Sequence, residues 1–164
     1  MEPLLFRNRF RVPSTRLRGW DYRWPGVYAV TICVKGRVCC LGEVVEEDVA
    51  LSPIGVIVAE EWLAIPRTHP QVILDEWIIM PDHVHGILTF QAQECPAPEN
   101  GLPAGSLGAV VGQFKQRTTK RIRARRRPDF FWQERYFDQI LRREDDLESY
   151  RAYIRENPSR WSLA

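Results

Sequence analysis

The sequence predicts an α+β fold in which helices pack against an antiparallel sheet. Apolar, β-branched runs occur in pairs that are separated by short turn signals, as the strands of a hairpin are. Capping residues stand before stretches whose apolar residues recur at helical spacing. The length of 164 residues suits a single domain, since domains mostly run to about 100–200 residues. These observations favour a two-layer or three-layer sandwich.

The first half of the chain predicts a hairpin followed by a helix. Two apolar runs, Val27–Lys35 and Arg37–Glu46, meet at a Lys-Gly turn signal and are expected to pair as antiparallel strands. Ser52 is a good N-cap, and Pro53 suits the first helical position. Apolar residues continue at helical spacing from there until Pro66, so a helix is expected over this segment.

The middle of the chain predicts a second strand pair and a loop. Val72–Met80 and His83–Gln91 are apolar runs joined by the turn signal Pro81-Asp82. Residues 92–105 are rich in Pro, Gly and small polar side chains and are expected to form a flexible loop. The expected order up to this loop is strand, strand, helix, strand, strand.

Two helices are expected in the last third of the chain. The first begins at the cap Ser106 and runs to about Arg125, with most of its basic side chains directed outward. The second is expected over Arg142–Glu156 and should end at Asn157-Pro158. The apolar side of the first helix consists of Leu107, Val110, Val111, Phe114 and Ile122.

One domain is expected over residues 25–164, preceded by an irregular basic arm over residues 1–24, where scattered arginines follow no clear period. No apolar run approaches the ~18 residues of a membrane-spanning helix, and Met1–Phe10 lacks the layout of a signal peptide. We therefore expect a cytoplasmic protein with no membrane partner, associated with the nucleoid if it is bacterial. Four cysteines lack the paired spacing of zinc sites and are expected to be reduced and buried, namely Cys33, Cys39, Cys40 and Cys95.

The distribution of charge is more informative than the net charge of +2. Eight basic residues and no acidic one lie between positions 115 and 127. Such a stripe is typical of a surface that binds a phosphate backbone, although the solvated face of an ordinary helix has the same pattern. This basic stripe consists of Lys115, Arg117, Lys120, Arg121, Arg123, Arg125, Arg126 and Arg127.

A His-Val-His sequence is the sharpest chemical feature of the chain. On a strand, His83 and His85 project from one face and could bind a divalent metal, unless they are ordinary sheet residues. On a helix, Tyr153 and Asn157 lie four residues apart and share a face. A phenol with a pKa near ~10 is a poor nucleophile unless a metal polarises its target or a base assists it. Away from a metal, Tyr153 is a core residue and Asn157 a helix terminator.

Several segments, in the right order, resemble the single-tyrosine HUH transposases. Trp77–Leu88, with the sequence WIIMPDHVHGIL, is similar to the block in which that family carries its metal-binding histidines. Ser106–Arg121, Phe131–Arg142 and Tyr153–Pro158 resemble segments of its REP-associated tyrosine transposase branch. The resemblance covers residues 24–161, nearly the whole chain.

The resemblance implies a ferredoxin-like antiparallel sheet flanked by helices, within one HUH transposase-like catalytic domain. It implies His83 and His85 as metal ligands, with Mg²⁺ or Mn²⁺ as the cofactor. It further implies Tyr153 as the nucleophile and Asn157 as a third metal ligand. The implied partner is single-stranded DNA, in particular hairpin-containing repeat ends, and the protein would act as a monomer or a homodimer.

The implied reaction cleaves and rejoins single-stranded DNA through a 5′-phosphotyrosine. The basic stripe would hold the DNA backbone, and Phe131, Trp132 or Tyr136 could stack on an unpaired base. The chain departs from the family at Asp82, where Asn is commoner, and this change is expected to be benign or mildly metal-attracting. It also departs at Gln139, where many members carry His, so no acid-base role is assigned there.

Three other functions fit parts of the sequence. One is a domesticated module that binds DNA or RNA hairpins without catalysis, although such a chain would have no need to keep all four site residues. A second is a small hydrolase that combines the histidine pair with Asp82 or Asp138 and works without Tyr153. A third is a structural or partner-binding protein, in which the histidine pair and the basic stripe are coincidences.

Overall fold

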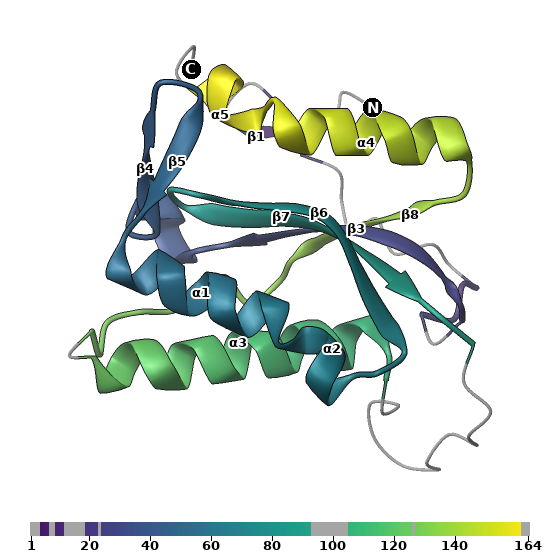
Figure 1. Ribbon diagram of the computed structural model, residues 1–164, viewed down its shortest axis with the longest axis horizontal. Helices are drawn as coiled ribbons and strands as arrows, with labels where there is room; N and C mark the ends of the chain where they lie inside the picture. The colour runs from purple at the N-terminus through teal and green to yellow at the C-terminus, as the bar shows by residue number, and fades with distance from the viewer. Residues whose placement is uncertain are drawn as a thin grey trace.

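The computed structural model describes residues 4–6, 9–11, 19–22, 24–92, 105–125 and 127–161. A four-stranded antiparallel sheet with the order β6-β7-β3-β8 lies at its centre, and helices cover both faces (Figure 1). The prediction of an α+β fold with an antiparallel sheet flanked by helices is therefore confirmed. The strands of this sheet are β3 (Gly26–Cys33), β6 (Val72–Met80), β7 (His83–Phe90) and β8 (Phe137–Leu141).

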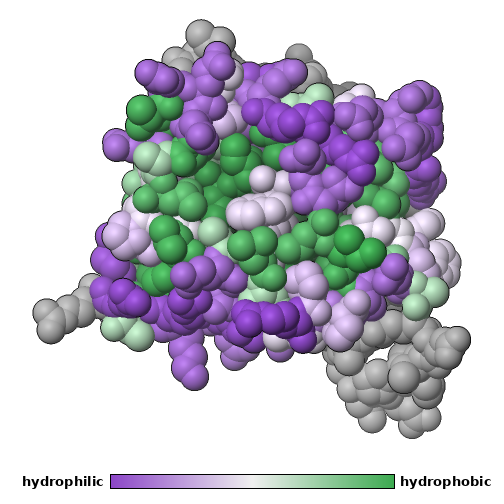
Figure 2. All heavy atoms as spheres, in the orientation of Figure 1, coloured by the Kyte–Doolittle hydropathy of each residue, from purple (hydrophilic) through white to green (hydrophobic). Residues whose placement is uncertain are grey.

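The helices divide between the two faces of the sheet (Figure 1). One face carries α1 (Pro53–Leu63), α2 (Ile65–Thr68) and α3 (Leu107–Ala124), and the other carries α4 (Glu144–Arg155), which continues into α5 (Asn157–Trp161). Polar side chains gather over α3 and α4, with a more apolar band between them (Figure 2). The elements outside the sheet are the ribbon β1 (Leu4–Phe6) and β2 (Arg9–Arg11), the 3-10 helix η1 (Lys35–Arg37), and the hairpin β4 (Gly42–Val45) and β5 (Asp48–Leu51).

Both predicted helix caps are present. The hydroxyl of Ser52 accepts a hydrogen bond from the backbone N–H of Gly55 at 3.1 Å, and α1 begins at Pro53. The hydroxyl of Ser106 accepts one from the N–H of Ala109 at 3.2 Å, and α3 begins one residue later. Each cap satisfies an N–H group that has no partner within its helix, which explains why both helices start where the sequence predicts.

The side chains of β3 alternate between the two faces of the sheet, and each face has its own layer of the core. Tyr28, Val30 and Ile32 are fully buried in the larger cluster, together with residues of α1 and α3. Ala29 lies on the other face, in a smaller cluster with Ile154 of α4. Successive side chains of a strand point to opposite faces, so each residue of the sheet belongs either to the α1/α3 side or to the α4 side.

Gly86 allows α1 to pack directly on β7. A Cβ atom at this position would lie 2.1 Å from Cζ2 of Trp62, which is fully buried. Because no side chain can share that space, the indole of Trp62 covers the backbone of β7 on the α1/α3 side. The strand that begins at His83 is thereby held against a large, rigid side chain.

The predicted pairing of Val27–Lys35 with Arg37–Glu46 is wrong. The first run is β3, but its two edges pair with β7 and β8, which come from distant parts of the sequence. The chain turns away after β3, and Gly36 and Arg37 both have positive φ, at 68° and 57°. Of the second run, only Gly42–Val45 is a strand, and it pairs with β5.

Other expectations are corrected in part. The expected strand pair Val72–Met80 and His83–Gln91 is confirmed as β6 and β7, whereas the strand β8 was not predicted. The arm expected to be irregular includes the antiparallel ribbon β1–β2. The helix expected over Arg142–Glu156 is confirmed as α4, which ends at Arg155, but the short helix α5, which starts at Asn157, was not predicted. Most of the expected loop, residues 93–104, lies outside the described residues.

Three cysteines, Cys33, Cys39 and Cys40, are free thiols in the described part of the chain. Cys33 and Cys40 are partly buried, but Cys39 is exposed, so the prediction of burial is wrong for that residue. Cys95 lies outside the described residues. Among the helices that the structure describes, none is long and apolar enough to cross a membrane.

Ion pairs attach α4 to β6 at a β-bulge between Leu74 and Trp77. Arg151 contacts both carboxylate oxygens of Asp75, with Nε–Oδ1 at 2.9 Å and Nη2–Oδ2 at 2.6 Å. Arg155 contacts Glu76 at 2.9 Å. The bulge brings two consecutive carboxylates to α4, and the bidentate pair fixes the position of the helix along the sheet.

This attachment predicts a dependence of stability on pH. The hydrogen bond from Arg151 lowers the pKa of Asp75, in spite of its partial burial. The stabilisation is fully present above the unfolded-state pKa of about 3.9, and it is lost as the pH falls through the lower folded-state pKa. Asp75→Asn should therefore lower the free energy of unfolding at pH 7, by an amount that shrinks below about pH 4.

Urea unfolding, followed by tryptophan fluorescence between pH 7 and pH 3.5, measures this difference. Asp129→Asn is the matched control, because Asp129 is an exposed loop carboxylate that contacts Arg127 at 3.5 Å. A constant difference between wild type and Asp75→Asn across this pH range would contradict the prediction.

Candidate active site

His83 and His85 lie side by side at the start of β7, on the face of the sheet that α4 covers. Their ring centroids are 4.4 Å apart, and each residue is only 5% exposed. The register places His83 opposite Cys33 and His85 opposite Thr31 on β3. The predicted placement of both imidazoles on one face is confirmed.

His85 is held between a threonine and a tyrosine. Its Nδ1 lies 2.7 Å from the hydroxyl of Thr31, and its Nε2 lies 3.5 Å from the hydroxyl of Tyr153 on α4. Burial lowers the pKa of His85 well below its usual value, and the neighbouring His83 and Arg37 add to this effect. The ring is therefore neutral at physiological pH, the state in which imidazole binds metals.

His83 is oriented by a buried carboxylate. Oδ1 of Asp82 lies 2.6 Å from Nδ1 of His83, and Oδ2 lies 3.0 Å from Nε of Arg37. Asp82 is fully buried, and Arg37 also donates to the sulfur of Cys33 at 2.7 Å. Because a carboxylate only accepts hydrogen bonds, Nδ1 of His83 carries the hydrogen, and Nε2 is the nitrogen that would bind a metal.

Of the two tyrosines near the histidines, Tyr153 presents its hydroxyl to them. Its ring centroid is 5.3 Å from that of His85, and the guanidinium of Arg160 lies 5.7 Å from the Tyr153 ring. Tyr150 packs against Tyr153, and its hydroxyl is hydrogen-bonded to Thr31. Burial raises the pKa of Tyr150 to about 12, so this phenol stays protonated.

The segment that follows Tyr153 stays close to the site. Glu156 has helical backbone angles (φ −84°, ψ −4°) and joins α4 to α5. Asn157 is the first residue of α5 and is 8% exposed. At the end of α5 the ring of Trp161 lies 6.0 Å from that of His83. The role of Asn157 as a metal ligand stays a prediction.

The donor set suits one divalent metal. Nδ1 of His83 is bonded to Asp82 and Nδ1 of His85 to Thr31, so the Nε2 atoms of both imidazoles point away from those partners. Among the described residues, no group of three or more His, Cys, Asp or Glu side chains could hold a metal. Further ligands would therefore be an amide such as Asn157, water or a phosphate oxygen, an arrangement that leaves positions open for substrate.

The structure disfavours both acidic partners that a hydrolase would use with the histidines. The two carboxylate oxygens of Asp82 face His83 and Arg37. Asp138 pairs with Val30 in the register of β8 and β3, and Val30 belongs to the α1/α3 core. Directly opposed residues of paired strands share a face, so Asp138 lies across the sheet from the histidines.

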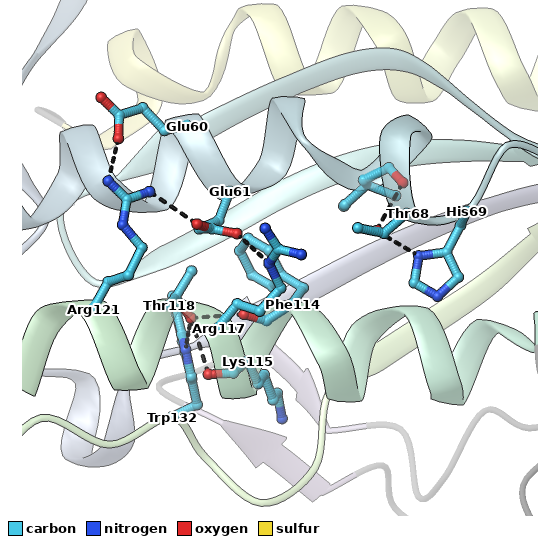
Figure 3. A network of polar contacts seen from close by, with 11 residues as sticks. Glu60, Glu61, Thr68, His69, Phe114, Lys115, Arg117, Thr118, Arg121 and Trp132 are labelled. Atoms are coloured by element: carbon cyan, nitrogen blue, oxygen red, sulfur yellow. Dashed lines mark hydrogen bonds and ion pairs between the residues drawn. The ribbon is translucent and has the colours of Figure 1, made fainter.

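The basic stripe lies mainly on α3, on the face of the sheet opposite the histidines (Figure 1). Arg117 and Arg121 both contact the buried carboxylate of Glu61, at 2.7 and 2.9 Å, and Arg121 also contacts Glu60 (Figure 3). Burial opposes the charge on Glu61, but the hydrogen bonds from Arg121 and Arg117 outweigh it and lower the pKa of Glu61. These two arginines therefore connect α3 to α1.

Other members of the stripe are also bonded within the protein. Nζ of Lys115 donates to the carbonyls of Gln133 and Glu134, at 2.7 and 3.3 Å. Nε of Arg123 donates to the carbonyl of Phe130 at 3.2 Å. The remaining described members are the exposed residues Lys120, Arg125 and Arg127, whereas Arg126 lies outside the described residues. The expected outward direction of the charge therefore holds for only part of the stripe.

The aromatic residues after α3 differ in what they could contact. Trp132 is buried, and its indole N–H donates to Thr118 at 2.8 Å (Figure 3). Tyr136 is partly buried under Lys115. Phe131 is 46% exposed, between Arg123 and Lys35. Of the three residues expected to stack on bases, Trp132 is thus part of the core and only Phe131 is widely exposed.

Sequence reasoning missed two residues that shape this site. Thr31 and Arg37 were not singled out, although Thr31 contacts His85 and Arg37 contacts Asp82, the neighbour of His83. The alternation along β3 could have indicated that Thr31 faces the same side as the histidines, but only after β3 and β7 had been paired in the correct register.

Two sequence comparisons match this chain over most of its length. The family model "Transposase IS200 like" matches residues 26–157. A protein of Haemophilus influenzae (strain Rd) is 33% identical over 162 residues, which cover 90% of this chain and 88% of that protein.

Two solved structures are also similar. One is a REP-associated tyrosine transposase bound to a REP hairpin, with a TM-score of 0.61 and 19% identity, covering 85% of this chain and 70% of that one. The other is a putative transposase from Deinococcus radiodurans R1, with a TM-score of 0.49 and 18% identity, covering 88% and 97% of the two chains. The first of these shares the fold, and the family match includes both histidines and Tyr153. The chain therefore belongs to the IS200-like transposase family.

Proposed function

We propose that this protein cleaves and rejoins single-stranded DNA beside hairpins, through a covalent 5′-phosphotyrosine on Tyr153. The observation that carries the proposal is the approach of the Tyr153 hydroxyl to within 3.5 Å of Nε2 of His85, next to the second imidazole of His83. A related fold binds a REP hairpin, which supports a DNA hairpin as the partner. Family membership supports strand transfer as the reaction class.

In this proposal His83, His85 and Asn157 hold Mg²⁺ or Mn²⁺. A divalent ion at this place supplies charge stabilisation to a non-bridging oxygen of the scissile phosphate. Asp82 and Thr31 fix the two rings, so that both imidazoles are oriented before DNA binds.

The reaction exchanges one phosphodiester for another. Attack by Oη of Tyr153 forms an O–P bond and breaks the bond between phosphorus and the 3′-oxygen of the leaving strand. The phenol loses one proton, and the released 3′-oxygen gains one. Because the phosphotyrosine conserves the energy of the broken bond, a 3′-hydroxyl can later attack it and rejoin the strands without an external energy source.

Tyr153→Phe tests the nucleophile. We expect wild-type protein with Mn²⁺ or Mg²⁺ to form a covalent adduct with some members of a library of labelled single-stranded hairpin oligonucleotides, and Tyr153→Phe to form none. A denaturing gel measures the adduct. Tyr150→Phe is the matched control, because Tyr150 is one helical turn away and its hydroxyl is bonded to Thr31, so this variant should retain most of the adduct.

The other outcomes of this assay separate the alternative functions. Cleavage that persists in Tyr153→Phe would indicate a hydrolase. Metal-dependent retention of hairpins, without an adduct in wild-type protein, would indicate a binding module that does not catalyse the reaction. Either result would contradict the proposal.

Asp82 is expected to act by orienting His83. In Asp82→Ala, Nδ1 of His83 loses its partner, and we expect Mn²⁺ affinity in the absence of DNA to fall about 10–100-fold. Asp82→Asn retains an oxygen that accepts the same hydrogen bond, so its affinity should lie much closer to wild type. Titration calorimetry with Mn²⁺ measures both variants, with Asp129→Asn as the control. Equal losses of Mn²⁺ affinity in Asp82→Ala and Asp82→Asn would show that the hydrogen bond from His83 to residue 82 does not determine metal affinity.

The exposed members of the basic stripe should differ in their effect on DNA binding from the members that pair with the buried carboxylate of Glu61. Neutralising an exposed residue that contacts phosphate, such as Lys120, Arg125 or Arg127, should lower the slope of log affinity against log salt by about one. Arg117→Gln should leave this slope unchanged and lower stability, because Glu61 then loses a partner. Fluorescence anisotropy at several salt concentrations measures the slope. An unchanged slope in all three exposed variants would exclude this surface from DNA contact.

A further inference from the structure

We propose that a groove beside His83 binds one unpaired nucleobase next to the scissile phosphate, stacked on Trp161 and hydrogen-bonded to Glu43 through its amino group. This inference rests on the proposed function, and it specifies which chemical groups of the DNA the site selects. The groove has a volume of about 430 Å³. Its lining consists of Cys39, Gly42, Glu43, Val44, Pro81 and Trp161.

The wall of the groove formed by the segment before β4 is rigidly attached. The backbone N–H of Leu41 donates to the carbonyl of Pro81 at 2.9 Å, and the carbonyl of Leu41 accepts from the N–H of Ser52 at 2.9 Å. The hydroxyl of Ser52 donates to the carbonyl of Cys40 at 2.7 Å. The turn before His83 and the cap of α1 therefore hold this wall in place from two sides.

Close packing behind the wall confirms that it cannot shift easily. A Cβ at Gly55 of α1 would lie 1.9 Å from the carbonyl oxygen of Leu41, and one at Gly42 would lie 2.6 Å from that of Ala50. Both positions thus require glycine for the observed approach of the backbones. A groove built on such contacts is formed before a ligand arrives, which reduces the entropy cost of binding.

The groove lies next to the catalytic groups. The ring of Trp161, in its lining, is 6.0 Å from the ring of His83, and Pro81 is two residues before that histidine. α5, which carries Trp161, follows the helix of Tyr153 and packs on β5. A base bound in this groove would therefore belong to a nucleotide adjacent to the phosphate that Tyr153 attacks.

The chemistry of the lining selects a base and not a phosphate. None of the six lining residues is cationic, and the carboxylate of Glu43 repels phosphate. An indole offers a face for stacking that accepts any base. A carboxylate accepts a hydrogen bond from the exocyclic amino group of cytosine, adenine or guanine, and thymine has no such group. We therefore expect an amino-bearing base to be preferred.

The test measures binding separately from cleavage. The probes are single-stranded hairpin oligonucleotides that differ only at one unpaired position beside the hairpin, which carries cytosine, adenine, thymine or an abasic site. Affinities are measured by fluorescence anisotropy in the Tyr153→Phe background, so that no covalent product forms. At one position, we expect cytosine or adenine to bind about ten-fold more tightly than an abasic site, with thymine in between.

Variants of the lining residues test whether the base preference comes from the groove. Trp161→Ala should abolish the difference between a base and an abasic site, whereas Trp161→Phe keeps an aromatic face and should retain most of it. Glu43→Gln should retain this difference between a base and an abasic site. Its affinity for the thymine probe should equal its affinity for the cytosine probe, because an amide also donates to O4 of thymine. The matched control is Trp24→Ala, since Trp24 is 48% exposed and lies before β3, outside the groove.

The outcomes separate this inference from the proposed function. If wild-type protein forms the adduct but no position shows a base preference, or if Trp161→Ala behaves like Trp24→Ala, the inference is overturned and the proposed function stands. If wild-type protein neither forms an adduct nor binds any of the hairpins, the proposed function itself fails. Thermal unfolding of each variant shows whether a loss of preference comes from a loss of folding.

Discussion

The antiparallel register between β7 and β3 is the constraint on which the active site depends. It places His83 opposite Cys33 and His85 opposite Thr31, so backbone hydrogen bonds between the strands bring the hydroxyl of Thr31 to the imidazole of His85. Between the histidines, Val84 is fully buried on the other face of the sheet. A slip of one residue would exchange these faces and move both imidazoles into the α1/α3 core. The burial of Val84 on one face of the sheet therefore keeps the two imidazoles on the other face.

Within this register, one buried charge organises the surroundings of His83. A carboxylate as buried as that of Asp82 is costly unless both oxygens are paired, and here they face His83 and Arg37. Arg37 reaches this position because the backbone turns with positive φ at Gly36 and Arg37 itself. The turn that prevents the predicted hairpin with β3 is thus the same turn that supplies the partner of Asp82. The orientation of His83 is set by the fold, before any metal or DNA binds.

Prediction from the sequence succeeded where the signal is local. Helix caps, the strand pair that meets at Pro81-Asp82, and the shared face of two histidines in a His-x-His sequence follow from the spacing of neighbouring residues. The partners of β3 could not be predicted in this way, because β7 and β8 come from distant parts of the chain. Thr31 and Arg37 were missed for the same reason, since their roles exist only once those strands have paired.

The basic stripe shows a different limit of sequence reasoning. A sequence shows how many charges a segment carries, whereas a nucleic acid meets only those that folding leaves unpaired. Glu61 pairs with two arginines of α3, and the sheet separates that helix from the histidines. The groove beside Trp161, in contrast, has no cationic side chain in its lining. In our proposal, recognition in this groove therefore relies on the shape and hydrogen-bonding groups of a base, whereas exposed lysines and arginines would contact phosphates elsewhere on the strand.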